Sequence, residues 1–286
     1  MTVIDRLGDA LEHATSLDRL SGPLASFWSA ALRPPALRDA VSGTALGHPL
    51  HPAAVLVPAG AFLSSTVLDA ADEPSAARRL AGIGVLTAAP AAVAGWSDWL
   101  DTEGAERRVG LVHAAANALG ITAYGVSWLQ RRRGHDGRAA GVVGLSLIGL
   151  GGWLGGHLAF ALGVGVDTTA FRTGPAEWTP VAGSEDITDA LSEVDAGDVT
   201  LVLTRLDGQV VAMENRCTHR GGALAEGSRV DGCVECPWHG SRFDLVTGAV
   251  RRGPATRPQP TYEVREREGR VEVRRQEARS LRANPV

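Results

Sequence analysis

Hydrophobic residues divide this chain of 286 residues into two unlike halves. From about residue 53 to residue 166 they form long runs of Ala, Gly, Val and Leu with few charges. From about residue 172 onward, charged residues are frequent and apolar residues alternate with polar ones. Long apolar runs favour helices and strict alternation favours strands. The pattern therefore predicts an α plus β protein with a helical first half and a β-rich second half.

The helical half contains four apolar stretches separated by charged connections, at residues 53–71, 80–96, 109–129 and 139–166. Each approaches or exceeds the roughly 20 residues that a helix needs to cross hydrocarbon. Buried helices of a soluble protein are the alternative, but four in succession with charged connections favour membrane spans. We predict a four-helix transmembrane bundle over residues 46–168, embedded in a lipid bilayer.

The first 45 residues contain no signal peptide, because no basic start is followed by an apolar run and a small-residue cleavage site. Apolar residues instead recur at helical spacing; they are Leu7, Leu11, Leu17, Leu20, Leu24 and Trp28. This spacing predicts one or two amphipathic helices that lie at the membrane surface or on a partner.

Four spans would place the N-terminus and the C-terminal half on the same side of the membrane. Near the spans, that side carries Arg33, Arg38, Arg107, Arg108 and Arg172. The opposite side carries Arg78, Arg79, Arg131, Arg132, Arg133 and Arg138. Basic residues concentrate on the cytoplasmic side, so the C-terminal half leans weakly toward the extracytoplasmic side.

Histidines gather on the side of the bundle that leads to the C-terminal half: His48, His51, His113 and His157. His157 is expected two to three turns before the fourth span ends. Asp98 and Asn117 fall in the same leaflet. Ionisable groups in membranes are costly and tend to be functional. We therefore expect His113 and His157 to bind a b-type haem or a quinone, with His48 and His51 as further candidates.

The alternative is a polar cluster that caps helices and holds the bundle together. Glycines precede His157 at positions 151, 152, 155 and 156. They would let either a flat cofactor or a neighbouring helix approach closely.

Five short motifs in this half are specific: Leu46-Gly-His-Pro-Leu-His-Pro52, Gly95-Trp-Ser-Asp-Trp99, Arg108-Val-Gly-Leu-Val-His113, Gly155-Gly-His157 and Gly163-Val-Gly-Val166. Together they resemble an uncharacterised bacterial family of four-helix membrane domains, over roughly residues 40–170. The resemblance supports the number of helices and implies no activity.

The second half contains two mixed pairs of metal-ligating residues, Cys217-Thr-His219 and Cys236-Pro-Trp-His239. A Rieske-type [2Fe–2S] cluster takes two thiolates on one iron and two imidazoles on the other. A structural zinc ion also takes two Cys and two His. Zinc fingers, however, usually pair Cys with Cys and His with His, so the mixed pairs favour the cluster.

The residues around these pairs read Cys-Thr-His-Arg-Gly-Gly-Ala-Leu and Cys-Pro-Trp-His-Gly-Ser-Arg-Phe-Asp. They resemble the two cluster-binding boxes of Rieske ferredoxins and oxygenases. Alternating segments at residues 199–204, 210–214, 241–245, 262–266 and 270–274 read as strands. We expect a linker at 169–176, an antiparallel β-sandwich Rieske domain at 177–275 and a tail at 276–286. The resemblance implies a third loop over the cluster at residues 253–255.

Two departures from respiratory Rieske proteins matter. Those proteins join the boxes by a disulfide, whereas the corresponding positions here hold Gly222 and Trp238. They also carry a Ser and a Tyr whose hydroxyls bond to sulfur; Ser241 keeps the first and Phe243 lacks the second. Hydrogen bonds to cluster sulfur raise the reduction potential. We predict a potential toward the low end of the Rieske range of about −150 to +300 mV. The third cysteine, Cys233, is expected to be a packed residue.

The sequence thus predicts a membrane-anchored Rieske electron carrier that exchanges electrons with a quinone, a haem or a redox partner protein, as a component of an oxidoreductase system. A net charge of −4 without a basic patch argues against nucleic-acid binding. Two alternatives are open. One is a Rieske-dependent oxygenase component, whose mononuclear iron would need two His and a carboxylate from the membrane half. The other is a redox or iron–sulfur sensor.

Overall fold

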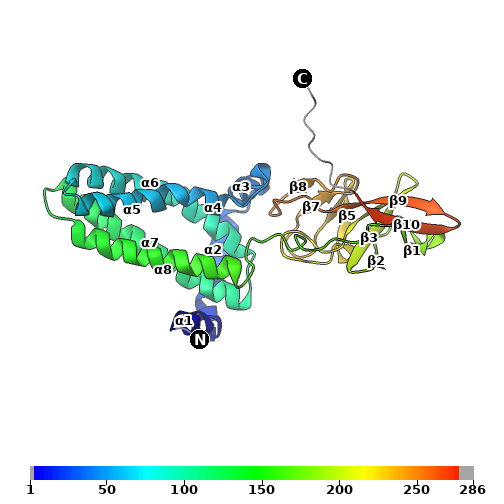
Figure 1. Cartoon of the computed structure of the whole chain (residues 1–286), viewed down its shortest axis with the longest axis horizontal. Helices are drawn as coiled ribbons and strands as arrows, with labels where there is room; N and C mark the ends of the chain where they lie inside the picture. The colour runs from blue at the N-terminus through cyan, green and yellow to red at the C-terminus, as the bar shows by residue number, and fades with distance from the viewer. Residues whose placement is uncertain (1–2, 277–286) are drawn as a thin grey trace, which may run out of the picture. The chain divides into compact units, whose positions relative to one another are not determined.

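The computed structural model describes residues 3–276, with side chains from residue 6 onward, so the predicted tail lies almost wholly outside the described residues. The chain forms two compact units. One consists of Met1–Gly43 with Pro49–Val166, and the other of Thr44–His48 with Asp167–Val286. The first is helical and the second is built from antiparallel sheets, which confirms the predicted α plus β fold class (Figure 1).

The helical unit contains three N-terminal helices and five that build the bundle. They are α1 (Val3–Glu12), α2 (Asp18–Ala31), α3 (Pro35–Ser42), α4 (Leu50–Ala54), α5 (Leu56–Ala70), α6 (Pro74–Leu100), α7 (Gly104–Arg132) and α8 (Arg138–Phe160). Four segments are long and apolar enough to cross a membrane: α4 with α5, then α6, α7 and α8. The four predicted spans are therefore present as helices that lie side by side (Figure 1).

The fourth span is shorter than predicted, because α8 ends at Phe160 rather than at Val166. Gly163 and Gly165 both have positive φ, a conformation that only glycine adopts without strain, and so the chain turns there. The expected position of His157 was wrong for this reason. It lies in the last turn of α8, not two to three turns inside it.

The bundle hides small and polar side chains and presents large apolar ones outward. Its buried residues include Ala77, Ala81, Ala88, Ala91, Ala94, Ser65, Ser97 and Ser127. Its exposed residues include Leu56, Val57, Leu63, Val67, Ile83, Leu86, Leu119, Val142 and Val143. A protein surface in contact with water rarely exposes so many large apolar side chains, whereas a surface in contact with lipid does. Small residues at helix–helix contacts are also typical of membrane bundles.

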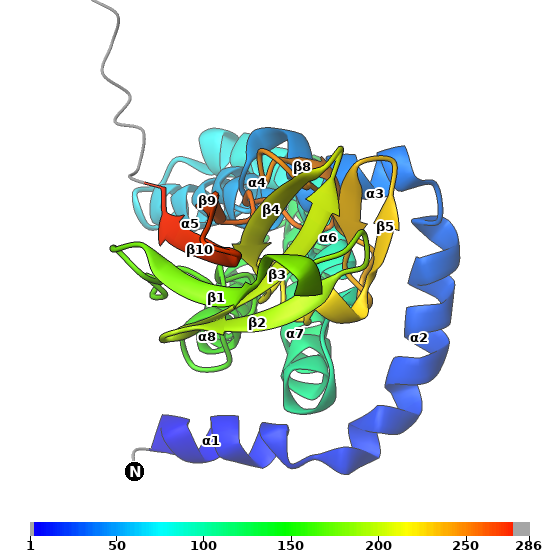
Figure 2. The same cartoon turned by 90° about the vertical axis from the view of Figure 1, so that its right-hand side faces the viewer.

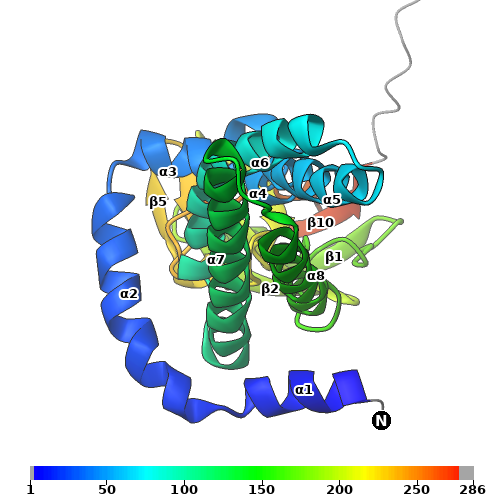
Figure 3. The ribbon, with the colours of Figure 1, turned by 90° about the vertical axis from the view of Figure 1, so that its left-hand side faces the viewer.

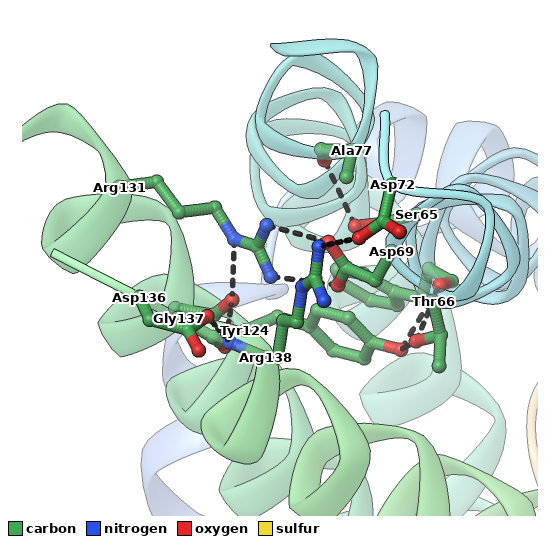
Figure 4. A network of polar contacts seen from close by, with 12 residues as sticks. Ser65, Thr66, Asp69, Asp72, Ala77, Tyr124, Arg131, Asp136, Gly137 and Arg138 are labelled. Carbon is green, nitrogen blue, oxygen red and sulfur yellow. Dashed lines mark hydrogen bonds and ion pairs between the residues drawn. The ribbon is translucent and has the colours of Figure 1, made fainter. Parts of the chain in front are cut away.

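An ion pair between Asp69 and Arg131 is the principal polar contact inside the bundle (Figure 4). Both guanidinium NH groups donate to the carboxylate at 2.6 Å, and both side chains are more than nine-tenths buried. The Nε atom of Arg131 donates to the hydroxyl of Ser127 at 3.2 Å. Beside this pair, Phe62 and Tyr124 stack with ring centroids 4.2 Å apart.

The N-terminal helices α1 and α2 run along the outside of the bundle (Figure 3). Arg108 of α7 ties them to it, because its guanidinium donates to both carboxylate oxygens of Asp18 and to the backbone oxygen of Glu12, each at 2.8 Å. Trp28 stacks on Trp96 of α6 at 5.3 Å. The prediction of one or two amphipathic helices agrees with this arrangement. Several apolar side chains of these helices stay exposed, Phe27 at 61% among them.

The second unit contains ten strands. They are β1 (Thr179–Gly183), β2 (Ser192–Ala196), β3 (Val199–Leu206), β4 (Gln209–Glu214), β5 (Ser228–Val230), β6 (Cys233–Glu235), β7 (Arg242–Asp244), β8 (Val250–Arg252), β9 (Thr261–Arg267) and β10 (Arg270–Arg275). One sheet has the order β1-β10-β9-β4-β3-β2 and the other β5-β6-β7-β8, with every pairing antiparallel (Figure 2).

The five predicted strands correspond to β3, β4, β7, β9 and β10, and the other five strands were missed. Three of the missed strands are only three residues long, too short for alternation to show. In β3, Leu201 and Leu203 face one hydrophobic core while Val202 faces a second. The second core also contains Cys217 and Cys236, so β3 of the larger sheet packs through Val202 against the core around these two cysteines.

Residues 167–172, which overlap the predicted linker at 169–176, pack within the second unit. The hydroxyl of Thr168 donates to the backbone oxygen of Cys217 at 2.8 Å. Arg172 pairs with the buried carboxylate of Glu214, at the end of β4. Burial raises the pKa of Glu214, and the Arg172 guanidinium opposes this shift. The linker is therefore part of the packing around the first cysteine loop.

Replacing Asp69 with Ala is expected to destabilise the helical unit strongly, because the Arg131 guanidinium would remain buried without its carboxylate. Removing one partner of a buried ion pair costs about 3–5 kcal/mol. The measurement is thermal unfolding of the full-length protein in detergent, followed by far-UV circular dichroism.

The matched control is Asp72→Ala, which removes an ion pair with Arg138 whose side chains are 83% and 43% exposed. Exposed pairs contribute about 0–1 kcal/mol. Replacing both Asp69 and Arg131 with Leu should recover most of the loss. Equal midpoints for Asp69→Ala and Asp72→Ala would show that the buried pair is dispensable.

Candidate metal centre

Two loops of similar local structure present the four predicted ligands. Cys217 and His219 follow β4, and Cys236 and His239 lie between β6 and β7. In each loop a glycine with positive φ donates its N–H to the oxygen of the cysteine four residues earlier: Gly221 to Cys217 at 2.8 Å, and Gly240 to Cys236 at 3.1 Å. The sequence folds this way because only glycine adopts this conformation freely.

The two loops bring all four ligands together. The imidazole rings of His219 and His239 have centroids 5.1 Å apart and an interplanar angle of 89°. The thiols of Cys217 and Cys236 are hydrogen-bonded to each other and are buried, with 1% and 3% of their residues exposed. Both histidines are only half-buried. The thiols thus lie on the inner side of the site and the imidazoles on its outer side.

Peptide N–H groups converge on both sulfur atoms. Those of His219 and Arg220 bond to Cys217, and those of Trp238 and His239 bond to Cys236. The hydrogen bond from the Cys217 thiol, with the two peptide N–H groups, lowers the pKa of Cys236 to about 7. The shared hydrogen bond and burial raise the pKa of Cys217. Peptide N–H groups aimed at sulfur stabilise thiolates, which are the form that binds iron.

This donor set fits a [2Fe–2S] cluster. One iron would take the two buried thiols, and the other iron would take the two half-buried imidazoles. Across residues 3–276, no three side chains of His, Cys, Asp or Glu come together at one point. The two-plus-two arrangement of a binuclear cluster needs no such group.

The third loop packs against the ligand loops as the resemblance implied. Ala255 is fully buried in the same core as Cys217 and Cys236. Its N–H donates to the hydroxyl of Ser241 at 3.0 Å. The Ser241 hydroxyl, fully buried, therefore accepts this bond and keeps its own proton for a further acceptor, such as a cluster sulfur.

Gln259 is a residue that the sequence did not reveal. Its side chain is buried, its amide nitrogen donates to the backbone oxygens of Glu214 and Arg216 at 2.7 Å, and its oxygen accepts from the N–H of Thr218 at 3.1 Å. These three bonds hold both sides of Cys217 in place. No spacing or motif marks a single amide in a loop, and only the folded chain places it here.

Gly222 and Trp238 lie against each other. A Cβ atom added at Gly222 would come within 2.9 Å of the indole and 3.1 Å of the Cys236 sulfur. The Trp238 side chain thus covers Gly222, and these two residues occupy the positions at which respiratory Rieske proteins carry a disulfide. Phe243 is fully buried in the core that contains both cysteines, and Cys233 is also buried.

The membrane histidines have other neighbours than expected. His113 lies beside His51, with ring centroids 6.2 Å apart, rather than being paired with His157. Nε2 of His157 donates to the Glu12 carboxylate at 2.8 Å, and the His157 ring stacks on Trp153. His48 belongs to the other compact unit.

The glycines before His157 accommodate neighbouring side chains. A Cβ atom at Gly151 would lie 2.5 Å from the Asn117 side chain, and one at Gly155 would lie 3.1 Å from the His113 ring. Gly152 faces open space and Gly156 meets only Phe160 of its own helix. Of the two expected roles, close approach of a neighbouring helix is the one that Gly151 and Gly155 serve.

Comparison with known proteins agrees with both halves. Residues 177–263 match the model of the Rieske [2Fe–2S] domain, and residues 47–168 match a family described as predicted membrane protein (DUF2231). The anthranilate 1,2-dioxygenase ferredoxin subunit of Burkholderia cepacia is 37% identical over 99 residues, which cover 34% of this chain and 92% of that protein. The naphthalene 1,2-dioxygenase ferredoxin component of Pseudomonas putida is 34% identical over 84 residues, 27% of this chain and 81% of that protein.

Among solved structures, the Sphingomonas yanoikuyae B1 ferredoxin matches at 29% identity with a TM-score of 0.33, covering 35% of this chain and 99% of its own. The sequence identity and coverage of the Burkholderia ferredoxin subunit, together with the domain match over residues 177–263, decide the assignment. The chain belongs to the Rieske [2Fe–2S] ferredoxin family and joins its Rieske domain to a membrane domain of the DUF2231 family.

Proposed function

We propose that this protein is a membrane-anchored electron carrier whose Rieske cluster is held by Cys217, His219, Cys236 and His239. The convergence of two buried thiols and two half-buried imidazoles on one site is the observation that carries the proposal. A bound [2Fe–2S] cluster supplies one-electron chemistry at a potential set by its ligands and hydrogen bonds.

The residues around the site divide the work. The four peptide N–H groups and the buried position of the thiols stabilise negative charge on sulfur and keep water away from it. His219 and His239 present partly exposed edges, through which an electron passes to a docked partner. A ring nitrogen that faces water also exchanges a proton, which would couple proton and electron transfer.

The partner is a redox protein or a membrane quinone or haem. The similar ferredoxins are named as components of dioxygenase systems, which supports a role for this chain as a component of an oxidoreductase system. A membrane anchor adds lipid-soluble quinones and membrane haems as partners. Within the helical unit, a second redox group would be held by His51 and His113, whose rings lie beside each other.

The anchored protein would be a multi-pass protein of the cell membrane, with its Rieske unit on the extracytoplasmic side. The distribution of Arg residues supports this orientation. Protease added outside spheroplasts should therefore remove the Rieske unit. Complete protection, with cleavage only after lysis, would reverse the orientation.

Replacing Cys236 with Ser should abolish the Rieske-type EPR signal of the reduced protein, because one of the two thiolates is lost. The matched control is Cys233→Ser, which removes a buried thiol of β6 that is not a proposed ligand. The control should keep the signal with about two irons per chain. Signals of equal intensity in the two variants would contradict the ligand assignment, and zinc in place of iron would contradict the cluster itself.

The reduction potential should lie toward the low end of the Rieske range, near about −150 mV, and Phe243→Tyr should raise it. A hydrogen bond of about 0.5–1.5 kcal/mol to the reduced cluster corresponds to ~20–65 mV for one electron. Redox titration followed by EPR measures both values. Phe243→Leu is the control, since it changes the packing without adding a hydroxyl. A wild-type midpoint near about +300 mV would refute the prediction.

A further inference from the structure

The buried residues of α5 recur in α7 at a constant separation. Phe62 corresponds to Tyr124 and Asp69 to Arg131, each 62 positions apart along the chain. The same offset relates further buried pairs: Pro58 with Gly120, and Ser65 with Ser127. This spacing of buried positions is common to packed helices, so it is the matching contacts of α5 and α7 that give the two helices the same place in two similar structures.

The contacts within each hairpin also recur. The Ser65 hydroxyl donates to the backbone oxygen of Ala77 in α6 at 2.8 Å (Figure 4). The Ser127 hydroxyl donates to Gly137, just before α8, at 2.7 Å. Ala77 and Gly137 are 60 positions apart (137 − 77), two fewer than the serines, because the acceptor lies 12 residues after the serine in the first hairpin and 10 residues after it in the second.

Glycines on α6 and α8 follow the same offset of 60. A Cβ atom at Gly84 would lie 2.4 Å from the Phe62 ring, and one at Gly144 would lie 2.6 Å from the Tyr124 ring. In both hairpins the second helix therefore approaches the aromatic ring of the first through a glycine. Helices α4–α6 and α7–α8 are two copies of one helical hairpin.

Equivalent residues of the two copies touch each other, and this places them on a pseudo-two-fold axis. Phe62 stacks on Tyr124, and Asp69 pairs with Arg131. A residue meets its own equivalent only at the axis of a two-fold arrangement. Both hairpins begin at the same end of the bundle, so the axis runs along the helices, as in membrane proteins with parallel repeats.

The histidines His51 and His113 are the next equivalent pair on this axis. The Nδ1 atom of His51 bonds to the Ala91 oxygen of α6, and that of His113 bonds to the Gly151 oxygen of α8, both at 2.8 Å. Each ring also packs on a glycine four residues after the residue whose oxygen it bonds to. The His51 ring packs on Gly95 of α6, and the His113 ring packs on Gly155 of α8. The two imidazoles are therefore held in the same way, and their rings meet edge to face with centroids 6.2 Å apart.

This arrangement decides which ring nitrogens are available. A carbonyl oxygen only accepts hydrogen bonds, so Nδ1 of each imidazole is the N–H donor and Nε2 carries the lone pair. Metal-ligating histidines are commonly oriented by such an Nδ1–H bond to a backbone oxygen. The amide nitrogen of Asn117 donates to the backbone oxygen of His113 at 2.9 Å and lies 3.3–3.4 Å from both ring nitrogens of His113.

We propose that His51 and His113 form one bis-imidazole site on the pseudo-two-fold axis, which binds a transition metal as haem iron or as a bare ion. Their ring centroids lie 6.2 Å apart at an interplanar angle of 82°. A metal bound by both rings would take the two Nε2 nitrogens, which the bonds from Nδ1 to the backbone leave as lone-pair donors. The site builds on the proposed electron-transfer function, since a redox-active occupant would be the cluster's exchange partner within the chain.

The test uses full-length protein purified in detergent from cells supplied with iron and haem precursor. Metal content, the optical spectrum after reduction and the Rieske EPR signal are measured on the same sample. The variants are His51→Gln and His113→Gln, whose amides still donate to the backbone oxygens but offer no imidazole. His157→Gln is the matched control, because this histidine bonds to Glu12 and lies off the axis.

We expect about one metal per chain beyond the two cluster irons. His51→Gln or His113→Gln should reduce this extra metal at least tenfold, and His157→Gln should leave it unchanged. Haem absorption bands would identify haem iron, and extra metal without them would identify a bare ion. A wild-type protein without extra metal after incubation with haem, Zn²⁺ and Cu²⁺, or axial variants that retain it, would overturn the proposal. The EPR signal reports the cluster separately, so loss of the Rieske function would be recognised independently.

Discussion

Each polar group that this chain buries must find its partner inside the protein. In an apolar medium an unpaired charge or hydrogen-bonding group costs several kcal/mol, and water is not available to replace the partner. The helical unit satisfies this requirement in two ways: Asp69 meets Arg131 between the two hairpins, and Ser65 and Ser127 each donate to a backbone oxygen within its own hairpin. The Rieske unit satisfies it at the cysteines, where peptide N–H groups and Gln259 surround the thiols and their loop.

Small residues make these contacts possible in both units. Gly84 and Gly144 allow the aromatic rings of the first helix in each hairpin to lie against the second helix. In the Rieske unit, Gly222 leaves the space that Trp238 occupies beside Cys236. A side chain at any of these positions would push apart elements whose polar groups depend on close approach. At Gly84, Gly144 and Gly222, glycine therefore serves close packing.

Much of this structure could be predicted from sequence, because long apolar runs and short ligand motifs are local signals. The four spans and the convergence of Cys217, His219, Cys236 and His239 follow from such signals. Contacts between distant residues do not. The repeat is hidden in the sequence because the equivalent of Asp69 is Arg131, opposite in charge, and because the offset changes by two between the helices of each hairpin. For the same reason the expected partner of His113 was His157, whereas the fold places His51 beside it.

The membrane half changes what a Rieske ferredoxin can do. The matched residues cover 92% of the Burkholderia ferredoxin subunit, so the Rieske unit alone is almost a whole ferredoxin. Joining it to a bundle turns a collision between two freely diffusing proteins into an encounter at a membrane, where the effective concentration of any membrane-bound partner is raised. The chain that leads into the Rieske unit also packs within that unit, since Thr168 donates to the backbone oxygen of Cys217 and Arg172 pairs with Glu214. These contacts hold the start of the unit against the loop that carries Cys217.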